Sequence, residues 1–186
     1  MSQKTEQSVP SQILAESLDP LRILAQLPLR PYQHLADFRC GKGALTIPLA
    51  KYVFEGKIYA TDETAILREE LESNLAGIHL TNAVVYDQKE EDATIDAESL
   101  DGALVALALS ATKTSKPAYL KRVAKLMKRG AWVAIVEWQK IESEEGPAMD
   151  KRLDDAEITD IAQQAGFRFT EKRNLSSDYY LVILRK

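Results

Sequence analysis

Asp37-Phe38-Arg39-Cys40-Gly41-Lys42-Gly43 lies between a short apolar run and a segment with helical periodicity. A glycine-rich turn between a strand and a helix brings bare backbone close to a ligand. An acidic residue, Asp62, then ends a second apolar run that starts at Lys57. Turn, helix, strand and acid in this order are typical of the first half of a nucleotide-type binding site.

The composition is ordinary for a soluble globular protein. Of the 186 residues, 45% are hydrophobic and 28% are charged, and the length suits one domain with a full core. The formal net charge of −4 argues against broad nucleic-acid binding, so we expect no nucleic-acid partner. Cys40 is the only cysteine, which rules out an intramolecular disulfide. A structural thiolate metal site is not expected either, and we predict no metal.

The sequence shows no sign of a targeting or membrane-spanning segment. The start, Met1 to Gln7, is polar, carries both charge signs and lacks the apolar core of a signal peptide. The longest apolar run, Gly102 to Leu109, is far too short to span a bilayer and is typical of a buried strand. We therefore expect a cytoplasmic protein with no transmembrane segment.

Apolar runs alternate with helical segments along most of the chain. Residues 1–10 are predicted to be disordered, and residues 11–186 to form one domain. Residues 11–33 are predicted to form an N-terminal helical segment of this domain that packs on the main fold, with short helices over Ser11–Leu18 and Leu21–Leu27. The pattern then predicts strands over His34–Phe38, Lys57–Thr61, Asn82–Tyr86, Gly102–Leu109 and Ala131–Trp138, with helices over Ala44–Val53, Thr64–Ala76 and Ala118–Lys128. Such buried strands alternating with helices indicate an α/β protein with a parallel sheet covered on both faces.

The C-terminal third departs from this alternation. Asp154 can cap a helix through Ala165, and Gly166 can close it. Two strands then follow in quick succession, Arg168–Arg173 and Tyr179–Leu184. The connector between them is too short for a crossover helix, so these strands should pair antiparallel. The pattern therefore predicts a seven-stranded, mostly parallel sheet that ends in an antiparallel hairpin.

The glycine turn resembles that of the class I S-adenosylmethionine-dependent methyltransferases, and most closely that of their small ubiquinone/menaquinone-type branch. Members of this family carry an acidic residue and then Gly-x-Gly-x-Gly, often with a cysteine before the middle glycine. Asp37 matches the acid, Cys40 matches the cysteine, and Gly41 and Gly43 match the second and third glycines. Arg39 stands where the family carries its first glycine.

The resemblance continues downstream and covers roughly residues 19–186. Asp62 matches the acid that holds the ribose hydroxyls in the family, and Asp87 matches the acidic position beside the adenine. The resemblance implies a Rossmann-like methyltransferase fold and S-adenosylmethionine as cofactor, with S-adenosylhomocysteine as product. The cofactor-binding residues that it implies are Asp37, Arg39, Cys40, Gly41, Gly43, Asp62, Glu63 and Asp87.

The activity that the resemblance implies is methyl transfer to an unidentified small-molecule or lipid-like acceptor. A homodimer is also compatible with it. Methyl transfer from a sulfonium needs little from the protein beyond alignment and exclusion of water, so the catalytic residues stay unknown. The segment Leu109–Thr114 lacks any acid, histidine or Asn-Pro-Pro-Tyr sequence. This absence argues against methylation of adenine or glutamine nitrogens as the family performs it.

Arg39 leaves two functions open. A guanidinium ~6 Å from the donor's cationic sulfur would cost roughly 3 kcal/mol at an effective dielectric constant of 20. Asp37 or the donor's own carboxylate could offset this cost, or the Arg39 side chain could turn to solvent. The alternative is a non-catalytic binding or scaffold protein with a lost or altered donor site. A dinucleotide-dependent oxidoreductase does not fit, because the loop lacks the last glycine of that motif.

Several of these residues also have a purely structural interpretation. Asp62 could cap the next helix, and Asp87 could simply end a strand. Cys40 has no histidine near it in sequence, so a structural role is favoured over a catalytic one. Three aromatic residues could line an acceptor pocket or, more commonly, pack in the core: Trp138, Tyr179 and Tyr180.

Overall fold

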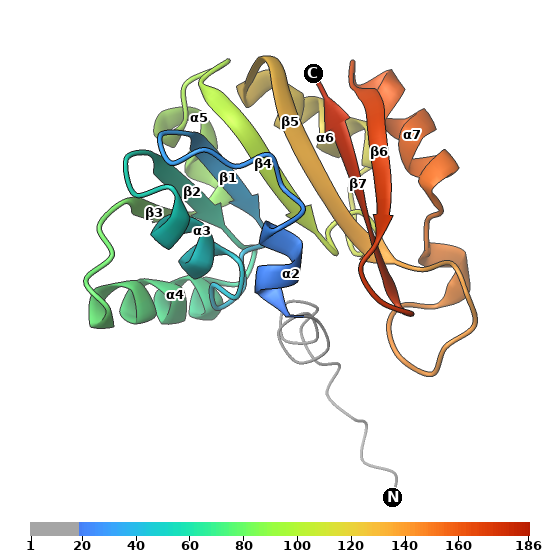
Figure 1. Cartoon of the computed structure of the whole chain (residues 1–186), viewed down its shortest axis with the longest axis horizontal. Helices are drawn as coiled ribbons and strands as arrows, with labels where there is room; N and C mark the ends of the chain where they lie inside the picture. Colours follow the sequence, from blue (N-terminus) through green and yellow to red (C-terminus); the bar gives the residue numbers. More distant parts are fainter. Residues whose placement is uncertain (1–18) are drawn as a thin grey trace, which may run out of the picture.

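Seven strands form one twisted sheet in the order β3-β2-β1-β4-β5-β7-β6 (Figure 1). The computed structural model describes residues 19–186, apart from the side chain of Asp92. Strands β1 to β5 run parallel, and β7 pairs antiparallel with both β5 and β6. This topology confirms the predicted α/β class, the mostly parallel sheet and the C-terminal hairpin. The strands are β1 His34–Phe38, β2 Lys57–Thr61, β3 Ala83–Tyr86, β4 Leu100–Ala106, β5 Met127–Trp138, β6 Arg168–Asn174 and β7 Tyr179–Arg185.

Helices cover both faces of this sheet, as predicted (Figure 1). One layer packs on the face that carries Trp132, and the other packs on the face that carries Val133. The first layer consists of α2 Pro20–Leu24, α3 Thr46–Tyr52 and α4 Ala65–Gly77. The second consists of α5 Glu91–Thr94, α6 Lys116–Leu126 and α7 Asp155–Gln164, and two short 3-10 turns lie at Gln88–Glu90 and Met149–Lys151.

Local sequence accounts for the longer helices. In α4, Leu67, Leu71 and Leu75 recur every four residues and form the buried stripe that faces the sheet. Helix α7 begins with a capping box. The Asp154 side chain accepts from the Glu157 backbone N–H, and the Glu157 side chain accepts from the Asp154 backbone N–H. These signals lie within one or two turns of chain, which is why the sequence predicts the helices well.

The burial of the strands follows their place in the sheet. Strands β4, β5 and β7 are interior strands, and most of their residues are buried. Strand β6 is an edge strand with the sequence RFTEKRN, and six of its seven side chains are exposed. Charged side chains on an edge strand oppose pairing with another chain, which suits its position.

Two elements end earlier than the sequence predicts. The predicted strand Gly102–Leu109 stops at Ala106, because Leu107 takes a left-handed conformation with φ of 51° and turns the chain out of the sheet. The predicted helix Leu21–Leu27 stops at Leu24, where i→i−3 turns replace helical hydrogen bonds ahead of Pro28. The predictions for residues 1–10 and for a helix over Ser11–Leu18 lie outside the described residues.

Strand β5 begins four residues earlier than predicted. Its first residue, Met127, pairs with Leu100 across an irregularity in β4. The Lys186 ammonium group at the end of the chain donates to the carbonyl oxygen of Met127 over 2.7 Å. Partners far away in the sequence therefore draw this segment, which was predicted as the end of a helix, into the sheet.

Gly102 provides a test of the packing in the middle of the sheet. A Cβ atom on Gly102 would lie 2.2 Å from Trp132 Cε2, and the buried indole ring has little room to move. We expect Gly102→Ala to lower the free energy of unfolding by about 1–3 kcal/mol, as overpacked cores do. Urea denaturation measures this effect.

Gly77→Ala is the matched control for this substitution. Gly77 ends α4, and no atom lies within 4 Å of the position that its Cβ would take. Alanine there should be neutral or should stabilise the protein by about 0.5–1 kcal/mol. Equal denaturation midpoints for the two variants would mean that the close approach of Gly102 to Trp132 is not needed.

Candidate functional site

The glycine turn after β1 has a backbone that ordinary side chains rarely adopt. Three of its residues have positive φ angles, namely Arg39 at 71°, Gly41 at 54° and Gly43 at 95°. The N–H groups of Arg39 and Cys40 both donate to the carbonyl oxygen of Thr61, over 2.8 and 3.0 Å, and so tie the turn to β2. The left-handed conformation of Arg39 gives a physical reason for the glycine that the family carries at this position.

Asp62 joins the glycine turn to the start of α4. One carboxylate oxygen accepts from the Gly41 N–H over 3.2 Å, and the other accepts from the Thr64 N–H over 2.9 Å. The residue is only 4% exposed. Asp62 therefore accepts from the backbone N–H of the N-cap residue of α4, Thr64, and no N-cap side chain caps this helix. Each oxygen retains a second lone pair, so this role does not prevent it from binding a hydroxyl group.

Arg68 bridges the ends of β2 and β3, and it is a site residue that the sequence analysis missed. Its guanidinium donates to the carbonyl oxygen of Asp62 over 2.6 Å and to the Asp87 carboxylate over 2.7 Å. The Lys89 backbone N–H and the Arg68 charge hold the pKa of Asp87 below its usual value. Asp87 is thus engaged as a cap and as an ion-pair partner. A basic residue one turn into the helix after Asp62 was the available signal.

Asp37 is a buried carboxyl group with one oxygen in use. Its Oδ2 accepts from the Thr46 hydroxyl over 2.6 Å, and its Oδ1 has no hydrogen-bond partner among residues 19–186. Burial raises the pKa of Asp37 to about 6; the Thr46 hydrogen bond opposes this rise, and the Asp62 charge adds to it. The group is therefore poorly stabilised as an anion within the fold.

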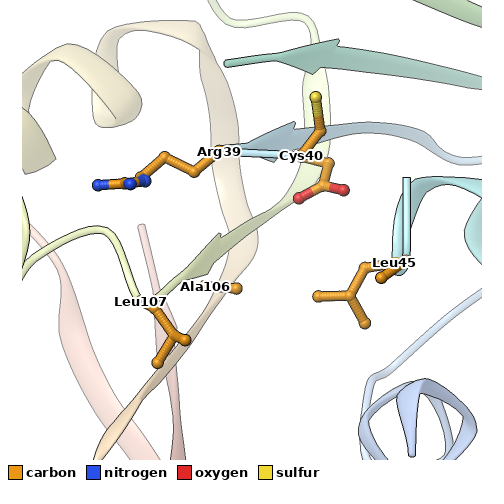
Figure 2. Close-up of a pocket in the computed structure, with 7 residues that line it drawn as sticks. Arg39, Cys40, Leu45, Ala106 and Leu107 are labelled. Atoms are coloured by element: carbon orange, nitrogen blue, oxygen red, sulfur yellow. The ribbon is translucent and has the colours of Figure 1, made fainter. Parts of the chain in front are cut away.

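A small hollow lies beside Asp37, and the enclosed part of it measures about 10 Å³, which is room for one water molecule. Figure 2 shows the Arg39 side chain on its border, extending away from Cys40 and Leu45. The residues that line the hollow come from the glycine turn, the start of the next helix and the end of β4, namely Asp37, Arg39, Cys40, Ala44, Leu45, Ala106 and Leu107.

The Arg39 guanidinium is half-buried and makes no hydrogen bond or ion pair within the described part of the chain. Its charge acts on the phenol of Tyr119 in α6. Burial raises the pKa of Tyr119 above its usual range, and the nearby charges of Arg122 and Arg39 oppose this rise. Glu63, another residue that the resemblance implies for cofactor binding, is exposed next to Asp62.

Cys40 and the three aromatic residues are buried. Cys40 is 3% exposed, and burial raises the pKa of its thiol far above the usual range, which excludes a reactive thiolate. Trp138, Tyr179 and Tyr180 are at most 2% exposed, and the first two stack with ring centroids 4.5 Å apart. They pack in the core, the second of their two predicted roles, and do not line an open pocket.

Two further observations bear on the class of site. Within residues 19–186, no three His, Cys, Asp or Glu side chains gather in a way that could hold a metal ion. None of the helices described is long and apolar enough to cross a membrane.

The fold is that of known methyltransferases. A SAM-dependent methyltransferase from Aquifex aeolicus aligns with 97% of this chain and 98% of its own, with a TM-score of 0.83 and 22% identity. A protein from Sulfolobus solfataricus described as a type 11 methyltransferase aligns with 83% of this chain and 84% of its own, with a TM-score of 0.69 and 19% identity.

A third structure of this fold contains both a cofactor product and an acceptor. It is an O-methyltransferase from neocarzinostatin biosynthesis, in complex with S-adenosyl-L-homocysteine and 1,4-dihydroxy-2-naphthoic acid. It aligns with 94% of this chain and 55% of its own, with a TM-score of 0.75 and 19% identity. No protein-family model and no curated protein matches the sequence. At these identities the comparisons establish the class I methyltransferase fold and not the activity.

Asp37 makes the stability of the fold depend on pH. Because its folded pKa of about 6 lies above the ordinary aspartate value of 3.8, the fold favours the protonated form. This contribution to stability is complete below about pH 4 and is lost as the pH rises through about 6. Asp37→Asn cannot ionise, so its free energy of unfolding relative to wild type should rise by about 2–2.5 kcal/mol between pH 4 and pH 8.

Urea denaturation at both pH values measures this difference. Asp150→Asn, which changes an exposed aspartate, is the matched control and should show no such rise. If the free energies of unfolding of Asp37→Asn and wild type differ by the same amount at both pH values, burial does not raise the pKa of Asp37.

Proposed function

We propose that this protein binds S-adenosylmethionine at the carboxyl ends of β1, β2 and β4 and transfers its methyl group to a small-molecule or lipid-like acceptor. Ligands of open α/β sheets bind at this edge. The observation that carries the proposal is the contact between the Asp62 carboxylate and the Gly41 N–H, which places an acidic group beside a glycine turn in a methyltransferase fold.

The residues present fit an adenosyl ligand in most respects. A buried carboxylate such as Asp62 can accept from two vicinal hydroxyls, and the turn lets a ligand approach bare backbone. The free Oδ1 of Asp37 offers an acceptor to a cationic group. When bound, S-adenosylmethionine supplies an activated methyl group, and the protein needs only to align it and to exclude water.

Two features oppose the fit. The hollow beside Asp37 has room for one water molecule, and Asp62 is 4% exposed, so the hollow in this conformation holds no ligand group larger than water. The unpaired Arg39 guanidinium opposes the positive charge of the sulfonium. The Arg39 charge favours a neutral sulfur over a cationic one. The two features together carry the second candidate function, a non-catalytic binding or scaffold protein of the same fold.

The acceptor is proposed as a small molecule because the neocarzinostatin-pathway structure of the same fold holds a dihydroxynaphthoic acid. The ubiquinone/menaquinone-type branch, the cytoplasmic location, the homodimer and the absence of a nucleic-acid partner stay predictions.

Asp62 tests the proposed ribose site. Asp62→Asn keeps the size of the side chain but removes charge-assisted hydrogen bonds worth ~1.5–3 kcal/mol each. We expect the dissociation constant of S-adenosylhomocysteine, measured by calorimetric titration, to rise at least about tenfold. Glu72→Gln changes an exposed acid on α4 and should leave it unchanged. An unchanged constant in a folded Asp62→Asn protein would mean that Asp62 only caps α4.

Arg39 tests the charge argument. Wild type should bind S-adenosylhomocysteine, whose sulfur is neutral, about tenfold more tightly than S-adenosylmethionine, since solvent screens part of the repulsion. Arg39→Gly removes the charge and suits the positive φ, so the gap between the two ligands should close. Calorimetric titration of both proteins with both ligands measures the gap.

Lys42→Ala is the control, because it removes an exposed charge from the same turn. It should leave the preference unchanged. Equal affinities in wild type that Arg39→Gly does not alter would refute the charge argument. If neither protein binds either ligand, the donor site is lost and the scaffold function replaces the methyltransferase function.

A further inference from the structure

Glu137, the second-to-last residue of β5, is a buried carboxyl group that the proposed chemistry does not use. The residue is 0% exposed and lies opposite Tyr180 of β7. Its Oε1 accepts two backbone hydrogen bonds, from the Leu109 N–H over 2.9 Å and from the Ser110 N–H over 3.0 Å. Its Oε2 has no hydrogen-bond partner in the described part of the chain. Glu137 therefore links the end of β5 to the turn after β4.

No positive charge offsets this burial. Within residues 19–186 Glu137 forms no ion pair, and burial raises the pKa of its carboxyl group. The charged groups that act on the neighbouring Tyr180 phenol are mainly carboxylates, from Glu137 itself and from α7. The Lys172 ammonium group lies over the Tyr180 ring. The α7 residues that contribute are Asp154, Asp155 and Glu157. An apolar side chain would fill this space at lower cost, so the two hydrogen bonds to the turn are the visible role of the carboxyl group.

The turn that Glu137 holds is strained and borders the hollow. Leu107 has a φ of 51°, a conformation that costs energy for any residue with a branched side chain. The Leu107 N–H donates to the carbonyl oxygen of Val136 over 2.8 Å, so β5 holds the turn at both of its ends. Leu107 also lines the hollow on the side opposite the glycine turn (Figure 2). Strained conformations persist only where the surroundings over-determine them.

We propose that Glu137 is a positioning residue, which fixes the strained turn 107–110 and thereby the wall of the donor site next to Arg39. The carboxyl group acts through the turn and does not touch the donor. The effect on the donor site rests on the proposed function. The hydrogen bonds by which Glu137 fixes the turn do not depend on that function.

The turn is tested first, without ligand, in the full-length protein. At constant pH, the amide ¹H signals of Leu109 and Ser110 should both lie downfield of their positions in Glu137→Leu, because both N–H groups donate to the same carboxyl oxygen. Glu137→Gln keeps an acceptor oxygen, so its two signals should stay close to those of wild type. Signals at the same positions in wild type and in Glu137→Leu would overturn the proposal.

Hydrogen exchange separates positioning from a general loss of stability. Glu137→Leu removes the acceptor, and Val133→Ala, on the same strand and also fully buried, removes only packing. After correction for global unfolding, exchange of the Leu109 and Ser110 amides should rise at least tenfold in Glu137→Leu and stay unchanged in Val133→Ala. Equal exchange in the two variants would overturn the proposal.

Titration with S-adenosylhomocysteine then tests the link to the donor site. We expect its dissociation constant to rise at least fivefold in Glu137→Leu and to stay within twofold of wild type in Glu137→Gln and Val133→Ala. Full affinity in Glu137→Leu would overturn the positioning role. If wild type binds no S-adenosylhomocysteine, the donor assignment fails, whereas the amide measurements still decide whether Glu137 holds the turn.

Discussion

The Asp62 carboxylate is the contact on which the geometry of the carboxyl edge depends. It accepts the N–H of Gly41 and the N–H of Thr64, and so connects the end of β1, the end of β2 and the start of α4. Arg68 then extends this connection to β3 through the carbonyl oxygen of Asp62 and the Asp87 carboxylate. Three adjacent strands are thereby held at one end by side chains as well as by their ladder. These contacts tie the backbone of the glycine turn to β2 and to the start of α4.

Buried acids dominate the electrostatics of this edge. Asp37, Asp62 and Glu137 are each at most 4% exposed, and none of them forms an ion pair within residues 19–186. Interior carboxylates without a counter-charge favour a cationic neighbour or a proton. The positive charge of a sulfonium would be favourable near Asp37 and Asp62. The half-buried Arg39 guanidinium already places a positive charge in the same region. The balance between these groups, and not the fold, decides whether the site holds a donor.

The glycine turn and the acids were predictable from local order along the chain. The order of Asp37, Gly41 and Asp62 along the chain suggested that they lie together, and the Gly41 N–H does donate to the Asp62 carboxylate. The conformation of Arg39 confirms that its position is one where glycine would be unstrained.

The chain order of apolar runs and caps was enough to predict the α/β class and the terminal hairpin, since helix caps and strand periodicity act over a few residues. The end of β4 at Ala106, the early start of β5 and the use of Glu137 were not predictable from this order. Each depends on a partner far along the chain: Val136 for Leu107, Lys186 for Met127, and the Leu109–Ser110 backbone for Glu137. Such contacts exist only once the sheet has assembled, because no local pattern records which distant backbone group a side chain will meet.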